Sequence, residues 1–134
     1  MPNEVAREVL QGGVPRGEGD MRVAIADGWL RLWVAPVPAL QLPDLDEGEA
    51  ACIRIASVCP KEALLLMDER AGRAVAGELG INVAGTAAII GMAKLKGLIP
   101  SARQVFEVLH GSAFRISAEV IQTILARVGE PESE

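Results

Sequence analysis

A short apolar run that ends in a carboxylate is the feature that most constrains this chain. Residues 64–67 read Leu-Leu-Leu-Met, and Asp68, Glu69 and Arg70 follow at once. A continuous apolar run of this length is typical of a strand that is buried on both faces of a sheet. In open α/β sheets, ligands and chemistry gather at the carboxyl ends of the strands. Asp68 is therefore the first candidate for a functional residue.

The segments around this run predict a mainly helical chain with few strands. After residues 64–67 we expect a helix that Gly80 ends, then a short strand over residues 81–84. This order predicts a right-handed parallel crossover. A further strand is expected at residues 29–34, before a linker that contains three prolines. Helices are predicted over residues 3–10, 20–26, 46–59, 87–96, 101–110 and 117–128.

Composition limits the classes of protein that the chain can belong to. Half of the 134 residues are hydrophobic but only 3% are aromatic, so aliphatic side chains must build the core. This length suits one compact domain, which we expect over residues 1–130, with an acidic tail at 131–134. The sequence shows neither an apolar run long enough to span a membrane nor a secretion pattern, so we expect a cytoplasmic protein. A net charge of −5 argues against a surface that holds long nucleic acid nonspecifically.

Capping patterns offer structural explanations for several polar residues. Asp46 and Glu49 have the spacing of a capping box, so Glu49 is expected to bond the backbone at the start of its own helix. Asp20 and Thr86 are each placed to cap a helix. His110 is expected at a helix C-terminus, where an imidazole interacts favourably with the helix dipole.

Cysteine and glycine patterns argue against other kinds of site. Cys52 and Cys59 are expected on one helix as buried free thiols, because two helical turns separate them. A single histidine and the absence of a Cys-x-x-Cys pair give no support to a zinc site. The glycine-rich loops of nucleotide-binding proteins are also absent from the sequence.

Four segments, in this order and at these distances, resemble one protein family. They are MPNEVAREVL at residues 1–10, LDEGEAACIRIA at 45–56, MDERAGRAVAGELGINVAGT at 67–86 and AKLKGLI at 93–99. They are similar to the PIN-like nuclease branch that is related to VapC-type toxins, over residues 2–130. The resemblance implies a three-layer α/β/α fold with a small, mainly parallel sheet, here helix-rich and truncated at its N-terminus. It also implies hydrolysis of single-stranded RNA with Mg²⁺ or Mn²⁺.

The resemblance also implies which residues form the site. Position by position, it implies metal ligands at Glu8, Glu49 and Asp68, with Glu49 and Asp68 also catalytic. Hard divalent cations prefer such oxygen ligands, and a bound metal activates water for attack on a phosphate. Auxiliary positions are Glu69, Arg70 and Thr86. Arg70 or Arg73 is expected either to pair with Asp68 or to contact phosphate.

The chain departs from the family pattern at its N-terminus. Relatives carry two strands and a further aspartate before the segment that is similar to residues 1–10. That aspartate is the family's central metal ligand, so we expect metal binding here to be weak or absent. Strand edges and apolar faces left bare promote association. We therefore expect a homodimer or a higher oligomer.

Three hypotheses for function remain open from the sequence. The first is a metal-dependent ribonuclease of PIN type. The second is a noncatalytic module that associates with itself or with an antitoxin-like partner. The third is a phosphoacceptor domain that uses Asp68, Thr86 and Lys94. Four basic residues are either a path for RNA or scattered solvated charges, namely Lys94, Lys96, Arg103 and Arg115.

Overall fold

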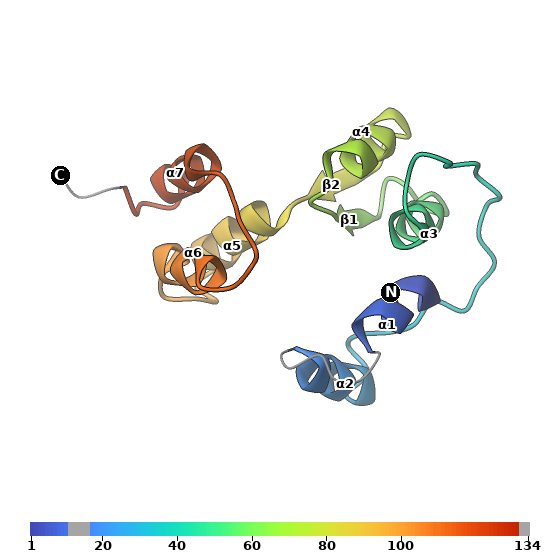
Figure 1. Ribbon diagram of the computed structural model, residues 1–134, viewed down its shortest axis with the longest axis horizontal. Coiled ribbons are helices and arrows are strands. Elements are labelled where there is room, and N and C mark those ends of the chain that lie inside the picture. Colours follow the sequence, from blue (N-terminus) through green and yellow to red (C-terminus); the bar gives the residue numbers. More distant parts are fainter. Residues whose placement is uncertain (11–16, 132–134) are drawn as a thin grey trace. The chain divides into compact units, whose positions relative to one another are not determined.

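The computed structural model describes residues 1–10 and 17–131, which divide into two compact units, within residues 1–83 and 84–134. Figure 1 shows that helices predominate and that the sheet is small. The predicted helix-rich α/β fold with a small parallel sheet is confirmed. The single domain over residues 1–130 stays a prediction, and of the predicted acidic tail only Pro131 lies within the described residues. None of the described helices is both long and apolar enough to cross a membrane.

The first unit carries the sheet and the helices that surround it in sequence. Two strands pair in parallel, and the helix between them, α4, connects one strand to the other. The elements up to residue 84 are α1 (Asn3–Val9), α2 (Glu18–Ala26), α3 (Glu47–Ala56), β1 (Leu64–Leu66), α4 (Arg70–Glu78) and β2 (Asn82–Ala84).

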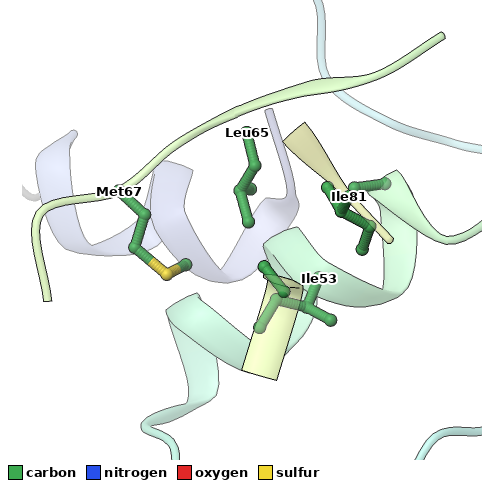
Figure 2. Packing of buried hydrophobic residues seen from close by; sticks show 6 residues of the cluster. Ile53, Leu65, Met67 and Ile81 are labelled. Carbon is green, nitrogen blue, oxygen red and sulfur yellow. The ribbon is translucent and has the colours of Figure 1, made fainter. Parts of the chain in front are cut away.

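The core of the first unit lies between α3, α4 and the sheet. Ile53 of α3 and Ala76 of α4 are completely buried. Figure 2 shows that Leu65, Met67 and Ile81 gather around Ile53, with the Met67 thioether reaching into the cluster. Burying one aliphatic side chain of this size stabilises a fold by about 1.5–3 kcal/mol. This cluster therefore fixes the end of β1, and with it the position of Asp68.

The prediction that residues 64–67 are buried on both faces of a sheet is wrong. β1 spans Leu64–Leu66 and alternates, with Leu65 buried but Leu64 and Leu66 51% and 61% exposed. Side chains alternate between the two faces of a strand, and only one face of β1 packs on the core. The expectation of full burial assumed a larger sheet that is covered on both sides.

The predicted strand over residues 29–34 does not form. The N-terminal ammonium donates to the Arg31 carbonyl at 2.7 Å, and the Trp33 amide donates to the Met1 carbonyl at 2.8 Å. These two bonds hold the segment beside the chain start without making it a strand. A strand needs a neighbour that continues the ladder, and proline at positions 36 and 38 removes backbone donors directly afterwards.

Local capping patterns located most helix ends, with two corrections. Gly17 precedes α2 with a φ of 88°, so Asp20 lies in the first turn rather than at the cap. Gly85 is the N-cap of α5 (Thr86–Leu95), which makes Thr86 its first residue. In both cases a glycine takes the non-helical position, three residues before Asp20 and directly before Thr86.

The second unit packs three helices on a core of its own. They are α5, α6 (Ala102–His110) and α7 (Ala118–Arg127), and their buried residues include Phe106 and Leu125. Ser101 and Ser117 cap α6 and α7, as their spacing predicts. A Cβ added at Gly91 would lie 2.9 Å from the Ile124 side chain, so glycine permits the close approach of α5 and α7.

The carboxylate of Glu130, which follows α7, is hydrogen-bonded to the start of α6. It accepts hydrogen bonds from the Ser101 hydroxyl and the Ala102 amide, both at 2.7 Å. These two bonds hold the pKa of Glu130 below the usual value of a glutamate, and the bond from Ser101 has the larger effect. Glu130 thus supports the start of α6, where unpaired backbone amides favour a negative charge.

We expect Gly72→Ala to destabilise the protein by about 1–3 kcal/mol, because the new methyl group would collide with the Met67 sulfur in the core. Gly77→Ala in the same helix is the matched control. Its Cβ meets nothing within 4 Å, so higher helix propensity should stabilise the protein by up to about 1 kcal/mol. Urea unfolding of both variants checks this, and equal effects would contradict the packing described for Met67.

We expect Glu130→Gln to lower the melting temperature at neutral pH. A lowered carboxyl pKa stabilises the fold above the unfolded pKa, and this stabilisation is lost as the pH falls through the folded pKa. The difference between wild type and variant should therefore vanish in acid. Thermal unfolding of wild type and variant from neutral to acid pH measures this difference. Glu107→Gln, on the exposed side of α6, is the control. A difference that stays constant down to low pH would contradict the role of the carboxylate.

Candidate functional site

Glu8, one of the three predicted metal ligands, lies where α1 packs on α3. Its Oε1 atom is 3.1 Å from the point that a Cβ on Gly48 would occupy, and Asp46 Oδ1 is 3.6 Å from the same point. Gly48 is buried, and its missing side chain leaves the room that Glu8 uses. The structure therefore gathers two carboxylates, Glu8 and Asp46, around the first turn of α3.

Glu49, the second predicted ligand, takes part in the capping box that its spacing predicts. The Glu49 amide donates to Asp46 Oδ1 at 2.8 Å, and Glu49 Oε2 accepts from the Asp46 amide at 3.3 Å. This reciprocal pair satisfies amides that would otherwise lack partners at the start of α3. The structural explanation for Glu49 is confirmed.

Asp68, the third predicted ligand, follows β1 and is exposed. It lines an open pocket of about 680 Å³ together with Arg70, Arg73, Gly77 and Asn82. Glu69 is the N-cap residue of α4, although its side chain makes no capping hydrogen bond. The carboxyl end of β1 therefore opens onto a concave surface that carries charges of both signs.

The two arginines of this pocket come from one face of α4. Arg70, Arg73 and Gly77 are three, four and seven residues apart, which places them on the same side of a helix. No hydrogen bond or ion pair to either guanidinium is found within residues 1–10 and 17–131. Asn82, at the start of β2, is a polar lining residue that the sequence did not single out. The position of Asn82 follows from the fold of β2 beside α4, and no local sequence pattern would have indicated it.

The three predicted metal ligands do not form one group. Glu8 and Glu49 belong to the packing of α1 on α3, whereas Asp68 belongs to the pocket beside α4. In the part of the chain that the structure describes, no three His, Cys, Asp or Glu side chains are arranged to hold a metal ion. The residues as arranged do not fit a three-carboxylate site for Mg²⁺ or Mn²⁺, and their ligand role stays a prediction.

Most residues of the predicted RNA path bond backbone carbonyls of the second unit. The Lys94 ammonium donates to the Pro100 carbonyl at 2.8 Å, and Arg103 donates to the Glu130 carbonyl at 2.8 Å. Arg115 donates to the His110 carbonyl, also at 2.8 Å. These bonds stabilise loops and the C-terminal end of the chain, so the three positive charges have a structural explanation that does not require RNA. For Lys94 this is an alternative to the role that a phosphoacceptor domain would give it.

The histidine and the two cysteines give no further candidate for a functional site. His110 ends α6 and accepts from the Ile116 amide at 3.4 Å through Nε2, so its expected position is confirmed. Cys52 is half-buried on α3, and burial raises the pKa of its thiol. Cys59 lies beyond the end of α3 and is exposed, so the expectation of two buried thiols on one helix is wrong. A raised pKa disfavours the reactive thiolate at Cys52.

Comparison with known proteins gives one result. A family model described as a PIN domain matches residues 1–130. No curated protein and no solved structure matched the chain. The match covers both compact units and includes all the acidic residues discussed above. The chain therefore belongs to the PIN domain family.

Proposed function

We propose that the chain is a PIN-type nuclease module that acts on single-stranded RNA in the cytoplasm, with Asp68 at the centre of its site. The observation that carries this proposal is the position of Asp68. Its carboxylate stands at the carboxyl end of β1, in a pocket that also presents two arginines. The PIN family match over residues 1–130 supports a nuclease rather than another use of such a pocket.

The pocket offers groups that suit attack on a phosphodiester. In this proposal Asp68, an exposed residue that lines the pocket, accepts a proton from the attacking nucleophile. Positive charge beside it favours the anionic phosphate. Glu49 acts through the capping box, where it holds the start of α3 and thereby the α1–α3 packing around Glu8. Because the three acids do not converge, binding of Mg²⁺ or Mn²⁺ by this chain is expected to be weak or absent.

A second candidate function is a noncatalytic module that associates with a second copy or with an antitoxin-like protein. Leu64 and Leu66 of β1 are 51% and 61% exposed, which leaves apolar surface on the small sheet. The sheet has two strands, so each strand has an outer edge without a strand neighbour among the described residues. Exposed edges and apolar faces of this kind favour association.

We expect Asp68→Asn to reduce cleavage of a single-stranded RNA by about 10²–10⁴-fold, the usual contribution of a positioned acid or base. Asp44→Asn is the matched control, because Asp44 is an exposed acid that does not line the Asp68 pocket. Cleavage is followed on a fluorescent oligonucleotide with Mn²⁺ or with EDTA. A manganese titration by calorimetry on the same proteins tests the metal separately, and we expect weak binding that Asp68→Asn abolishes.

The two candidate functions give different results in this assay. No cleavage by the wild type, together with equal manganese titrations for wild type and Asp68→Asn, would remove the nuclease proposal and leave the association module. Cleavage that EDTA abolishes would rule against a noncatalytic module. Equal cleavage by wild type and Asp68→Asn would mean that the activity does not belong to this site.

We expect the chain to form a homodimer or a higher oligomer through β1. Leu66→Lys should shift the protein toward the monomer, because it puts a charge on the exposed face of the strand. Leu98→Lys is the control, since Leu98 is 74% exposed and lies in the second unit. Size-exclusion chromatography with light scattering measures the mass. A stable wild-type monomer at micromolar concentration would contradict the prediction.

A further inference from the structure

We propose that Arg70 and Arg73 together form a binding site for one phosphodiester of single-stranded RNA, with Asn82 as an uncharged hydrogen-bond donor. The idea that this site places RNA for cleavage rests on the proposed nuclease function. The idea that it binds RNA does not, because its support is the shape and the charge of the pocket beside α4.

The shape of the pocket comes from small residues between the arginines and β2. Arg70 and Arg73 stand one turn apart on α4, and Ala74 and Gly77 follow on the same face. A Cβ added at Gly77 would meet nothing within 4 Å, so the helix surface beside the arginines is open. A volume of about 680 Å³ gives ample room for a phosphate and its neighbouring riboses.

The donors of the two guanidinium groups are available for a ligand. Several other described arginines bond protein atoms, namely Arg22, Arg31, Arg54, Arg103 and Arg115. Arg22 pairs with Glu18 at 2.7 Å, and Arg54 donates to the Leu40 carbonyl at 3.0 Å. Arg70 and Arg73 have no such bond within the described residues, although each carries planar donors that suit phosphate oxygens. Both are also exposed, so neither must break a contact with the protein before it binds a ligand.

The charge of the lining indicates which phosphate fits best. Arg70 and Arg73 contribute two positive charges and Asp68 one negative charge, which leaves a small positive excess in an otherwise acidic chain. A phosphodiester carries a single negative charge and matches that excess. A phosphate monoester or free phosphate carries more negative charge and is repelled more strongly by the Asp68 carboxylate. The pocket is therefore better suited to the backbone of a strand than to inorganic phosphate.

Single strands fit this site better than duplexes. Binding a duplex without reading its sequence needs a broad positive surface, and the net charge of −5 opposes one. A single strand is flexible and presents one phosphate at a time to a local pocket. The same placement brings the bound phosphodiester next to Asp68, where the proposed chemistry occurs.

The first experiment removes the charges. A fluorescein-labelled oligouridylate is titrated with the full chain in EDTA, and binding is followed by anisotropy at several salt concentrations. Arg70→Gln/Arg73→Gln should weaken binding at least about tenfold and make the salt slope less steep by about 0.7 for each phosphate that the protein no longer neutralises. Arg7→Gln/Arg127→Gln removes the same charge from exposed positions outside the pocket and should change neither quantity.

The second experiment fills the pocket and leaves both arginines in place. Gly77→Gln puts a side chain into the open space and should weaken oligouridylate binding severalfold. Gly19→Gln is the matched control, because Gly19 is an exposed glycine of α2 whose added Cβ also meets nothing within 4 Å. Thermal unfolding verifies that both variants fold. Inorganic phosphate at equal ionic strength should compete more weakly than unlabelled oligouridylate.

The outcomes separate this site from the nuclease proposal. Unchanged affinity and salt slope in Arg70→Gln/Arg73→Gln would overturn the site even if the protein cleaves RNA. Loss of binding in that variant alone would support the site even if no cleavage is found. Asp68→Asn should bind in EDTA at least as tightly as wild type, because it removes the repelling carboxylate. Stronger competition by inorganic phosphate than by oligouridylate would assign the pocket to a free anion and overturn the assignment to RNA.

Discussion

The close packing of Met67 against Gly72 is the contact on which the site depends. The Met67 side chain fills the space that a Cβ at Gly72 would need, which ties the residue before Asp68 to α4. The same side chain belongs to the core cluster with Ile53 and Ile81. Because Asp68 follows Met67 directly, the core fixes the carboxylate relative to the α4 face that carries the arginines. The arrangement of charged groups in the pocket is therefore supported by apolar packing beneath it.

The acidic residues divide between two tasks. Glu49 stabilises the start of α3 through the capping box, and Glu8 occupies the space above Gly48. Asp68 instead faces a pocket with two cations. A carboxylate that is engaged by backbone amides at a helix start contributes to the fold even when it has no ligand. Membership of the PIN family is consistent with either task for these residues, and the ligand role of Glu8 and Glu49 stays a prediction.

Most features that depend on neighbours in sequence were predictable. The capping residues Asp46, Ser101 and Ser117 all bond the amide three residues later, as their spacing indicates. That residues 29–34 form no strand was not predictable, because apolar composition does not reveal whether a partner strand exists. Exposure of Leu64 and Leu66 depends in the same way on what covers the sheet. The arginine face of α4 follows from helical periodicity once the helix starts at Arg70. The place of Asn82 in the pocket and the bond from Glu130 to the start of α6 could not be predicted, because they depend on how distant segments fold together.

The most direct test of the Asp68 site is to map where single-stranded RNA touches the protein. An oligouridylate is titrated into ¹⁵N-labelled protein, and the backbone amides and arginine Nε–H signals are followed by NMR. We expect the largest shifts to fall on Arg70 and Arg73 and on the amides of Asp68 and Asn82. Largest shifts in the second unit, around Lys94 or Arg115, would contradict the assignment of RNA binding to this pocket, as would a spectrum that does not change.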